Sequence, residues 1–420
     1  MSCKKNIRRL VAPLALLAWV SACGADTNRL LVIAPKSLLP ALTEFVAHKQ
    51  KLLPTQLISL EAVLDKGRSG DDPEKLKRFL YNDWRESGLG YVLLVGDVDV
   101  MPVRFMTLDR VAPAAFDYAF YPSDLYYSDL AKADGSFDDW NANKDSFHAE
   151  YFGEVRGEKN KNDPINFDQV DYQPDLAVGR WPVSTLEEAR LVAAKTISFE
   201  VDVVKNNNPY LRRVAAFVVG GWVDTREWMD GILQPFTNHW QIEKRYYSET
   251  NQPSGTLPPD HAQVRALLNG GLGLVLHTGH GQPHEWEQCF SVSDLDSLSN
   301  ALARPVIFSA GCSTAHFAPL PPYEPYVDVN GVEHAGSYKK EIFTAPPSPP
   351  APYQRGRCNP TGLGEEVLKR STNGGVAYIG CNTGSQPCGL TLMEGYLAAL
   401  AKMPEPRLGD CWNGAVRYYS

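Results

Sequence analysis

Short runs of apolar residues alternate with longer amphipathic stretches along most of the chain. Apolar runs at residues 29–33, 56–60 and 91–95 predict strands, and the amphipathic stretch 38–49 predicts a helix between the first two. A second helix is expected to begin at Asp72-Pro73, with Asp72 as N-cap and the proline at its first position. Strands and helices in alternation are typical of an α/β protein with a largely parallel sheet.

This rhythm breaks near residues 112–175, where Asp, Asn, Tyr and Gly are frequent and no periodicity persists. The stretch predicts a long loop or insertion. Regular structure resumes at 175–179, and overlapping capping-box patterns in Ser184-Thr185 and Glu187-Glu188 precede a helix that runs to about residue 204. Residues 206–209 then predict a linker. Two α/β units are therefore expected, over residues 23–205 and 210–420.

The second unit opens with an apolar run at 214–219, and further apolar runs at 272–276, 306–309 and 376–379 predict its other strands. The proline-rich residues 344–352 predict an exposed loop, because proline interrupts regular structure. The chain contains no Walker loop, dinucleotide-binding fingerprint or Gly-x-Ser-x-Gly motif. Phosphate transfer, nicotinamide chemistry and serine hydrolysis therefore lack support.

Composition narrows the function classes further. The 420 residues include 41 Lys and Arg against 49 Asp and Glu, with 44% hydrophobic residues and a net charge of −8. These values are ordinary for a globular protein and exclude collagen-like, disordered and membrane-bundle chains. The negative charge gives no reason to expect nucleic acid as a partner.

The first 22 residues have the pattern of a bacterial export signal. Two Lys and two Arg precede an apolar stretch at residues 10–20, which is too short to span a bilayer as a helix. Val20-Ser21-Ala22-Cys23 resembles a lipobox, in which cleavage leaves Cys23 as the acylated first residue; plain secretion is the alternative. Gly24, where an Asp would favour the inner membrane, makes an outer-membrane anchor the expectation. The sequence thus predicts a lipid-anchored protein of the bacterial cell envelope.

Export changes how the cysteines are interpreted, because free thiols outside the cytoplasm tend to pair. Cys381 and Cys388 are close enough in sequence for a disulfide within a short loop, although the connectivity stays open. One cysteine, Cys312, needs a separate interpretation because it directly follows a predicted strand.

Two apolar runs of the second unit end in reactive side chains. Residues 272–276 lead to His280-Gly281, and residues 305–309 lead to Cys312, 32 positions beyond the histidine. Ligands of an open parallel sheet bind beyond the carboxyl ends of its strands, so both side chains can face one crevice. Cys312 and His280 then form a candidate dyad.

The chemistry accounts for these residue types. A thiolate is the nucleophile, and an imidazole can take its proton and later protonate a leaving amine. The N–H groups of Gly281 and Cys312 are candidate oxyanion-hole donors, since glycine lets the backbone approach a substrate closely. The spacing alone leaves another interpretation open, in which Cys312 is a disulfide cysteine and His280 a turn residue.

The motifs around these residues resemble those of the gingipain family of cysteine peptidases, in the clan that includes caspases, legumains and clostripain. The resemblance covers nearly the whole mature chain; each motif is weak alone, but their order and spacing are specific. The matching segments are Val92–Asp97 followed by Pro102, Ser123–Tyr127, Pro174–Arg180 with Pro182–Thr185, Thr278–Gly281 with Trp286, the Ala-Gly-Cys ending at Cys312, and Asn373–Gly380.

This resemblance implies a caspase-like α/β fold of largely parallel sheets flanked by helices, in two subdomains, with Cys312 as nucleophile and His280 as general acid and base. Gingipains cleave after Arg or Lys, and an acidic residue at the start of a helix in the second subdomain reads that basic side chain. Asp230 is the best-placed candidate for this role, and Trp286 matches an aromatic wall of the same pocket. For Asp230 an ordinary helix-start acid is the alternative.

The sequence departs from the gingipain pattern after residues 214–219. Gingipains have a Glu there, near the catalytic histidine, whereas Gly220-Gly-Trp-Val-Asp224 follows here. Asp224 is a candidate replacement as orienting carboxylate. It is equally interpretable as a surface acid, which would leave a pure dyad.

Two groups of residues in the sequence are considered as metal ligands, one for calcium and one for zinc. Residues 134–150 alternate oxygen-bearing side chains near a Gly turn, and related family members carry better-formed Asp-rich loops there, which makes calcium a candidate although the EF-hand pattern is incomplete. The candidate ligands are Asp134, Asp138, Asn141, Asn143 and Asp145. His277, His280 and His284 lack the helical spacing of a zinc hydrolase. The expected reaction requires no cofactor.

The sequence therefore predicts an exported cysteine endopeptidase that hydrolyses proteins or peptides through a thioester acyl-enzyme, with cleavage after Arg or Lys as the implied specificity. The alternative is a catalytically silent surface lipoprotein that acts as a binding or assembly module. Thiol alkylation distinguishes the two, because only the peptidase would lose its function.

Overall fold

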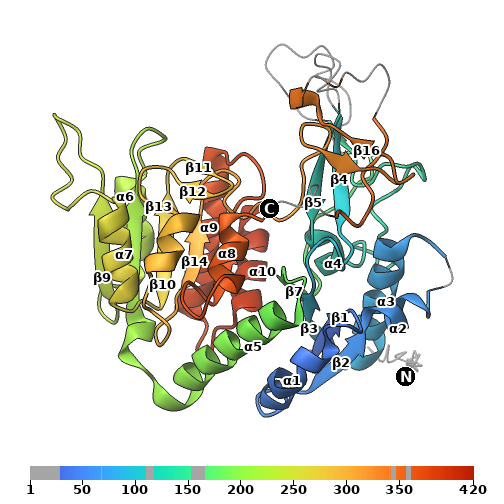
Figure 1. Cartoon of the computed structure of the whole chain (residues 1–420), viewed down its shortest axis with the longest axis horizontal. Helices are drawn as coiled ribbons and strands as arrows, with labels where there is room; N and C mark the ends of the chain where they lie inside the picture. The colour runs from blue at the N-terminus through green and yellow to red at the C-terminus, as the bar shows by residue number, and fades with distance from the viewer. Residues whose placement is uncertain are drawn as a thin grey trace, which may run out of the picture.

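The computed structural model describes residues 29–67, 69–109, 118–152, 166–339, 341, 347–355 and 361–420. The export signal, Cys23 and Cys358 lie outside these residues. Two separate parallel sheets, one in each half of the chain, are flanked by helices (Figure 1). This is the largely parallel α/β architecture that the sequence predicts.

The first sheet has the strand order β2-β1-β3-β7, and all neighbouring strands run parallel. Its central strand β1 is buried along almost its whole length, as expected when helices cover both faces of a sheet. The strands are β1 (Arg29–Ala34), β2 (Thr55–Ser59), β3 (Leu89–Val95) and β7 (Ala177–Trp181), and the helices around them are α1 (Thr43–Lys49), α2 (Leu60–Leu64), α3 (Asp72–Ser87) and α5 (Leu186–Val201).

The start of α3 differs by one residue from the prediction. Asp71, not Asp72, is the N-cap, and its side chain accepts a hydrogen bond from the Glu74 amide, so the proline is the second helical residue. At α5 the structure has a capping box between Thr185 and Glu188, as predicted. A π-helical turn at Asp202–Asn206 extends α5 into the region expected to be a linker.

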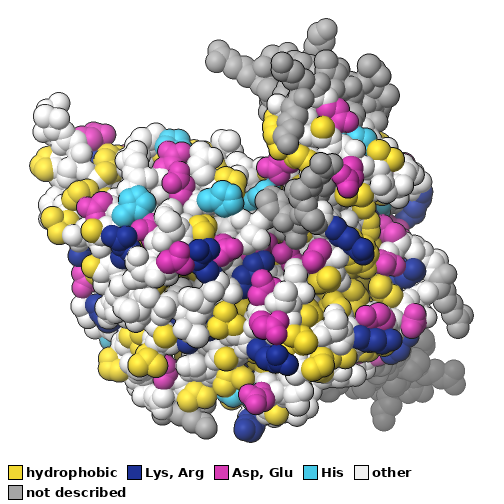
Figure 2. All heavy atoms as spheres, in the orientation of Figure 1, with side chains coloured by type: hydrophobic (Ala, Val, Ile, Leu, Met, Phe, Trp, Pro, Cys, Tyr) yellow, Lys and Arg dark blue, Asp and Glu magenta, His cyan; other side chains and the backbone are white. Residues whose placement is uncertain are grey.

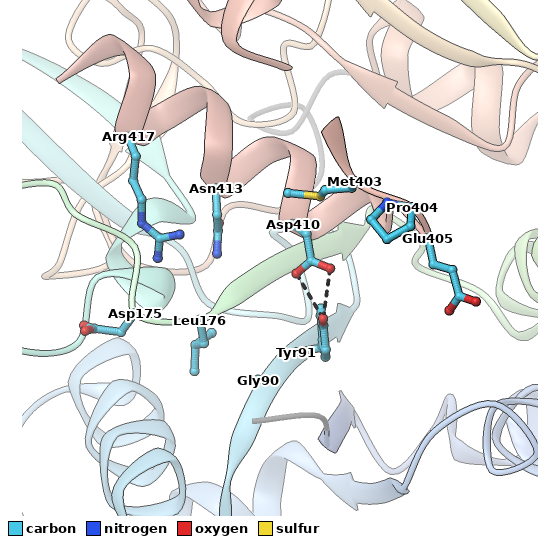
Figure 3. Close-up of a pocket in the computed structure, with 10 residues that line it drawn as sticks. All are labelled: Gly90, Tyr91, Asp175, Leu176, Met403, Pro404, Glu405, Asp410, Asn413 and Arg417. Carbon is cyan, nitrogen blue, oxygen red and sulfur yellow. Dashed lines mark hydrogen bonds between the residues drawn. The ribbon is translucent and has the colours of Figure 1, made fainter. Parts of the chain in front are cut away.

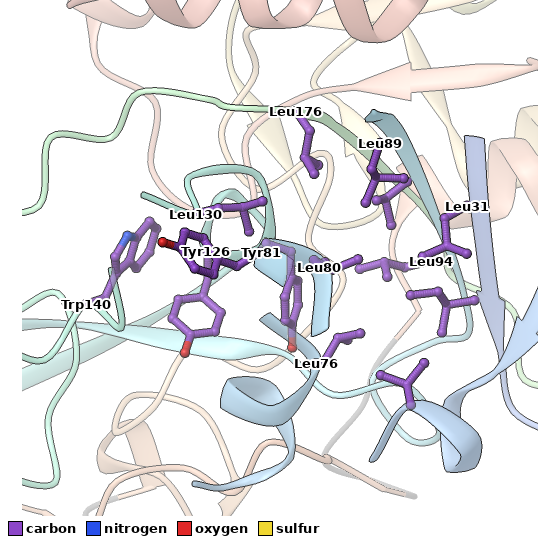
Figure 4. Close-up of a cluster of buried hydrophobic side chains, with 14 of the residues drawn as sticks. Leu31, Leu76, Leu80, Tyr81, Leu89, Leu94, Tyr126, Leu130, Trp140 and Leu176 are labelled. Carbon is purple, nitrogen blue, oxygen red and sulfur yellow. The ribbon is translucent and has the colours of Figure 1, made fainter. Parts of the chain in front are cut away.

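The region near 112–175 contains more structure than predicted. Strand β4 (Arg104–Asp109) pairs antiparallel with β5 (Tyr118–Ser123) and parallel with the short β6 (Tyr151–Phe152), and α4 (Leu125–Ser128) follows β5. Three side chains of this region, Tyr126, Leu130 and Trp140, are fully buried in the core cluster that also holds residues of the sheet (Figure 4). Periodicity did not reveal the region because its large apolar residues are inserted singly into the core.

The second sheet has the order β17-β14-β10-β8-β9 and is parallel throughout. Its strands are β8 (Arg213–Val218), β9 (Gln241–Tyr246), β10 (Leu274–Thr278), β14 (Val306–Ser309) and β17 (Ala377–Ile379), and its helices are α6 (Arg226–Leu233), α7 (His261–Asn269), α8 (Leu363–Lys369), α9 (Leu390–Lys402) and α10 (Leu408–Tyr419). Strand β9 was not predicted, because it is an edge strand with only its last residue buried.

The strand order of the second sheet determines where a ligand can bind. The chain passes from β8 to β9 on one side and then returns to form β10 on the other side of β8. The direction of winding therefore reverses between β8 and β10, and a crevice is expected beyond the carboxyl ends of these strands. Residues that follow β8, β10 and β14 surround this position.

After β14 the chain leaves the second sheet and packs on the first subdomain. A hairpin of β15 (Tyr326–Val327) and β16 (Glu333–His334) lies beside β4 and β5 (Figure 1). The Phe120 amide donates to the Pro321 carbonyl over 2.7 Å, and the Val103 amide donates to the Pro352 carbonyl over 3.0 Å. Residues 347–352, predicted as an exposed loop, are all buried or half-buried for this reason.

Short 3₁₀-helical segments lie between the longer elements, and the surface carries charges of both signs. Short segments of 3₁₀-helix occur at Leu39–Ala41, Pro209–Arg212, Gln234–Phe236, Val292–Ser297, Ser337–Lys339 and Pro387–Gly389. Acidic and basic side chains are interspersed over the face shown in Figure 2. Across the described residues, no helix combines the length and the apolar character that a membrane crossing requires.

Candidate active site

The two predicted catalytic residues follow neighbouring strands at matching positions. In the β10–β14 pair, His277 lies opposite Ser309 in the parallel register. His280 lies three residues beyond His277, and Cys312 lies three residues beyond Ser309. Each residue thus lies three positions beyond one member of a pair on two adjacent parallel strands. Both residues therefore lie at the same edge of the sheet, where the sequence predicts that they meet.

The loops that carry the pair are in contact through glycine backbone. A Cβ atom on Gly281 would lie 2.8 Å from the Cys312 carbonyl oxygen, and a Cβ on Gly311 would lie 3.3 Å from the Gly281 Cα. A contact of 2.8 Å cannot form without a shift of the backbone, so Gly281 requires glycine, and the 3.3 Å contact at Gly311 is tighter than is usual for a Cβ. The short strands β11 (Gly281–Gln282), β12 (Glu285–Trp286) and β13 (Phe290–Ser291) continue from the histidine loop as a small antiparallel sheet.

The His280 imidazole is oriented by a backbone carbonyl. Its Nε2 lies 2.8 Å from the carbonyl oxygen of Gly221, in the loop after β8. A carbonyl can only accept, so Nε2 carries the hydrogen, and in the neutral imidazole Nδ1 is left as the basic nitrogen. Gly221 adopts φ +92°, a conformation that favours glycine, and a Cβ there would lie 3.6 Å from the imidazole Cδ2.

Asp224 does not have the orienting role proposed from the sequence. Its carboxylate forms two hydrogen bonds of 2.8 and 2.9 Å with the Arg226 guanidinium, which lowers the pKa of Asp224 to about 2. Arg226 also donates to the carbonyls of Tyr247 and Gln252. The carboxylate therefore ties the loop after β8 to the loop after β9, and the Gly221 carbonyl takes the place expected for it beside the histidine.

Cys312 is held by a loop that the sequence analysis did not single out for this purpose. The Ser385 amide donates to the Cys312 Sγ over 3.1 Å. Ser313 has a left-handed backbone, φ +57°, and its amide donates to the Thr383 carbonyl over 2.8 Å. The loop at 381–385 follows β17, the neighbour of β14, so its position after a predicted strand of the same sheet was the available signal.

Both candidate oxyanion donors are free to meet a substrate. Among the described residues, no acceptor takes the Cys312 amide hydrogen. Gly281 pairs with Trp286 across the hairpin, and the neighbouring pair is hydrogen-bonded through the Glu287 amide and the His280 carbonyl, 3.2 Å apart. Hydrogen-bonded and non-bonded pairs alternate along an antiparallel ladder, so the Gly281 amide points away from β12.

A layer of buried polar side chains packs against the inner side of these loops. The rings of His277 and Trp286 stack with centroids 4.4 Å apart and planes at 6°. His277 Nδ1 lies 2.9 Å from the Ser309 Oγ, and the Trp286 Nε1 donates to the Tyr378 hydroxyl over 2.9 Å. Burial lowers the pKa of His277 to about 3 and raises that of Tyr378 to about 12, so both side chains are neutral at ordinary pH.

The burial of Trp286 corrects its predicted role. The indole has no exposed surface, because it packs under the catalytic loops between His277 and Phe290. It therefore does not form a wall that a substrate side chain can touch in this structure. The indole supports the loop that carries His280, and this support explains why Trp286 belongs to the matching motif.

The family model described as Peptidase family C25 matches residues 25–420. The chain belongs to peptidase family C25. Membership of this family makes it a cysteine-type peptidase that acts on peptide bonds, as the sequence predicts. The gingipain resemblance is thereby confirmed.

Three relatives of this C25 peptidase indicate how far the similarity extends. The crystal structure of the Arg-specific cysteine proteinase gingipain R (RgpB) matches with a TM-score of 0.59 and 16% identity, over 93% of this chain and 72% of that one. A complex of the pro- and mature domains of Porphyromonas gingivalis RgpB matches at 0.58 and 17%, over 92% and 73%. An uncharacterised protein of Archaeoglobus fulgidus is 22% identical over 361 residues, 79% of this chain and 69% of that protein. The structural matches establish the gingipain-like fold.

Asp230 of the C25 peptidase is engaged by side chains of β9. It lies on α6, and its carboxylate forms a 2.7 Å ion pair with Lys244 and accepts a 2.8 Å hydrogen bond from Tyr246, both on the edge strand β9. Two strands separate β9 from β14, which leads to Cys312. Asp230 is thus the fifth residue of α6 (Arg226–Leu233), not a helix-start acid, and its role in reading a basic substrate side chain stays a prediction.

The candidate calcium ligands form hydrogen bonds within their own loop. Asp134, Asp138 and Asp145 each accept a hydrogen bond from a backbone amide two residues further on, and the Asn141 side chain accepts from the Asp145 amide. Asn143 instead reaches the Glu150 carboxylate, at 3.4 Å. Within the part of the chain that is described, no group of three or more His, Cys, Asp or Glu is arranged to hold a metal ion. Calcium binding by these residues stays a prediction.

The remaining cysteines of the C25 peptidase differ from Cys312. Cys381 and Cys388 are both free thiols, so the predicted short-loop disulfide is not formed in this structure. Burial raises the pKa of the thiols of Cys289, Cys381 and Cys411, which disfavours the nucleophilic thiolate. Cys312 lies on the loop that contacts Gly281, the residue after the candidate general base His280.

A separate cavity of about 520 Å³ lies between β3 and α10 (Figure 3). Tyr91 of β3 donates to the Asp410 carboxylate across it, at 3.0 Å. Its lining contains no residue of the loops after β8, β10 or β14. This cavity is therefore distinct from the catalytic edge.

Proposed function

We propose that this C25 peptidase is an exported, lipid-anchored endopeptidase that cleaves peptide bonds with Cys312 as nucleophile and His280 as general acid and base. The observation that carries the proposal is the meeting of the β10 and β14 loops at the carboxyl edge of the sheet, beside the reversal of winding between β8 and β10, with Gly281 against the Cys312 backbone. The export and anchoring part rests on the sequence pattern that ends at Cys23.

The first chemical step forms the acyl-enzyme. His280 Nδ1 takes the proton of the Cys312 thiol, and the thiolate attacks the scissile carbonyl carbon, whose oxygen becomes an oxyanion. The amides of Gly281 and Cys312 donate to that oxygen. The intermediate collapses with cleavage of the C–N bond; the protonated His280 gives its proton to the leaving amine, and a thioester remains on Cys312.

The second step returns the enzyme. His280 takes a proton from a water molecule, whose oxygen attacks the thioester carbonyl. Collapse of the second oxyanion breaks the C–S bond and releases a peptide carboxylic acid, and the proton on His280 returns to the sulfur. The Gly221 carbonyl accepts from Nε2–H throughout, which keeps the imidazole in one orientation through both steps.

The test is hydrolysis of a fluorogenic peptide panel that varies the residue before the scissile bond. Cys312→Ala and His280→Ala are expected to lose activity by orders of magnitude, because nucleophile and base act as a unit. Cys388→Ala removes an exposed thiol elsewhere and is the matched control, expected to retain wild-type turnover. Full activity in Cys312→Ala would overturn the proposal.

Absence of turnover in wild type, after activation of any latent precursor has been attempted, would support a binding module instead.

The same peptide panel tests the preference for the residue before the scissile bond. Because Lys244 already neutralises Asp230, Asp230→Asn is expected to leave any preference for Arg or Lys unchanged.

The lipid anchor has an independent test. Globomycin-type inhibition of lipoprotein signal processing, or the Cys23→Ala change, is expected to move the protein from the membrane fraction to the soluble fraction without altering peptidase activity. Unchanged membrane association in Cys23→Ala would exclude the anchor while leaving the catalytic proposal intact.

A further inference from the structure

We propose that Thr314 is a positioning residue for the oxyanion hole, because its hydroxyl holds the peptide group that presents the Cys312 amide. The inference rests on the proposed function, since it takes Cys312 as the nucleophile. It concerns a residue two positions beyond the nucleophile that does not touch the reacting atoms.

The Thr314 side chain is buried directly behind the nucleophile. It has no exposed surface, and its Oγ1 lies 3.0 Å from the Gly311 carbonyl oxygen and 3.1 Å from the Ser309 Oγ. A carbonyl oxygen can only accept, whereas the Ser309 hydroxyl can also donate. The hydroxyl hydrogen of Thr314 therefore satisfies the Gly311 carbonyl, which would otherwise be buried without a partner.

Because the peptide group is planar, the hydrogen bond to the Gly311 carbonyl also fixes the direction of the Cys312 N–H. The Gly311 carbonyl and the Cys312 N–H belong to one trans peptide group and point in opposite directions. With the carbonyl held toward the buried Thr314, the amide hydrogen points toward the opposite, substrate side. No described residue accepts that hydrogen, as required of an oxyanion donor.

The residue before the nucleophile is held at its other end as well. The Gly311 amide donates to the Ser309 Oγ over 3.2 Å, and the same oxygen lies 2.9 Å from His277 Nδ1. The Tyr378 hydroxyl is also hydrogen-bonded to Ser309 and Thr314. The backbone at Gly311 is therefore fixed by side chains from β14, β10 and β17.

The Thr314 methyl group links the two candidate donors. A Cβ on Gly281 would lie 2.5 Å from the Thr314 Cγ2, and a Cβ on Gly311 would lie 3.1 Å from it. The methyl group thus packs against the backbone at both glycines. One side chain therefore orients the Cys312 amide with its hydroxyl and sets its spacing from the Gly281 amide with its methyl.

Thr314→Val is the decisive variant, because it keeps the shape and removes the hydroxyl. Loss of one oxyanion donor costs about 10²–10³ in kcat, so a misdirected donor is expected to lower kcat/KM by about 10- to 100-fold, mostly through kcat. Affinity for a peptide aldehyde, whose thiohemiacetal oxygen occupies the same position, is expected to fall in parallel. Alkylation of Cys312 by iodoacetamide should stay within about threefold of wild type, because that displacement develops no oxyanion.

Thr314→Ser is the matched control, because it keeps the hydroxyl and loses the methyl, and it is expected to stay within about fivefold of wild-type kcat/KM. If Thr314→Val does not fold, Thr314→Ala and Thr314→Ser form a second pair that differs by one oxygen, and the Ala variant is expected to be slower by about 10-fold. Wild-type hydrolysis in Thr314→Val, or an equal loss of hydrolysis and alkylation, would overturn the inference while the peptidase stands. An inactive wild type would overturn the proposed function itself.

Discussion

At the scale of single residues, backbone groups carry out the positioning that the sequence assigned to side chains. The Gly221 carbonyl orients His280, and the Ser385 amide contacts the Cys312 sulfur. The acidic candidates Asp224 and Asp230 are instead engaged by Arg226 and Lys244. A backbone dipole is fixed when the loop folds and loses no rotamer freedom on use, so it can orient an imidazole without a buried carboxylate.

Gly281 is expected to tolerate no side chain. In Gly281→Ala the new Cβ would meet the Thr314 Cγ2 at 2.5 Å and the Cys312 carbonyl at 2.8 Å, so the loops must separate. Since misplacement by about 1 Å can cost about 100-fold in rate, kcat/KM is expected to fall at least that far. Gly179→Ala in β7, where no atom lies within 4 Å of the new Cβ, should match wild type in the same assay. Equal activities in both variants would refute the close contact.

At the scale of elements, the insertion after β4 is held by a carboxylate that the sequence analysis did not select. Asp168 is 2% exposed and accepts hydrogen bonds from the amides of Ala142 at 2.6 Å, Asn143 at 3.4 Å and Glu150 at 2.7 Å. The predicted calcium ligands cap local turns within the same loop. A carboxylate that gathers several amides performs the ordering that a bound cation would otherwise provide.

Stability of the insertion is therefore expected to be independent of metal. EDTA or added Ca²⁺ should shift the thermal midpoint by less than about 1 °C, whereas Asp168→Ala should lower it by several degrees, because it leaves three amides without their acceptor. Differential scanning fluorimetry measures both. A calcium-dependent rise of the midpoint in wild type would restore the calcium hypothesis, and Asp139→Ala, outside the predicted ligand set, serves as a control for nonspecific charge effects.

The β15–β16 hairpin has a pH-dependent element in His334. Its ring stacks on Tyr326 and lies 3.0 Å from Asp328 and 2.9 Å from Glu341. Burial opposes the charged ring, but the two carboxylates outweigh it and raise the pKa of His334. A raised folded-state pKa means that this stabilisation is fully present below the unfolded value of about 6.5 and is lost as pH rises through the folded value.

Hydrogen exchange of residues 326–336 is expected to accelerate as pH rises through that window, after correction for the intrinsic rate. His334→Phe retains the stack on Tyr326 and removes the charge, so its corrected exchange should be faster at low pH and lose most of the pH dependence. The same profile in both proteins would show that another group controls the hairpin.

At the scale of the whole molecule, two buried lysines join the subdomains. The Lys195 Nζ on α5 lies within hydrogen-bond distance of four carbonyl oxygens that its three N–H groups share, those of Val367 at 3.0 Å, Leu368 at 2.8 Å, Ser371 at 3.2 Å and Asn373 at 2.6 Å, at the end of α8. Lys369 on α8 lies 3.3 Å from Asp97, which follows β3. A cation suits the carboxyl end of α8, where carbonyls lack helical partners.

Lys195→Met is expected to destabilise the protein by about 3 kcal/mol, because it fills the volume but leaves buried carbonyls without a donor. Urea denaturation measures the change, and the exposed Lys402→Met at the end of α9 is the matched control, expected to change stability by less than about 0.5 kcal/mol. Two separate transitions in Lys195→Met would indicate that α5 and α8 couple the folding of the subdomains. A urea unfolding curve identical to that of wild type would mean that Lys195 makes no net contribution to the free energy of unfolding.

The sequence by itself determined the features that local pattern encodes. Apolar runs with strand length predicted the strands of both sheets other than the edge strands β7 and β9, and the strand-end positions of His280 and Cys312 predicted where they meet. These inferences hold because a buried parallel strand must be apolar along its length, and because the carboxyl ends of parallel strands share one edge. Motif order and spacing were enough to identify the peptidase family.

Only the tertiary structure decided how each side chain is used. Asp224, Asp230 and Trp286 have the right type and position in the sequence, yet their partners Arg226, Lys244 and Tyr378 come from contacts that linear spacing does not encode. The Ser385 amide reaches Cys312 from 73 positions away, and the segment after β14 is buried by another subdomain. Hydrogen bonds and burial depend on which surfaces meet after the chain has crossed between sheets, so these roles follow from the packing of the whole molecule.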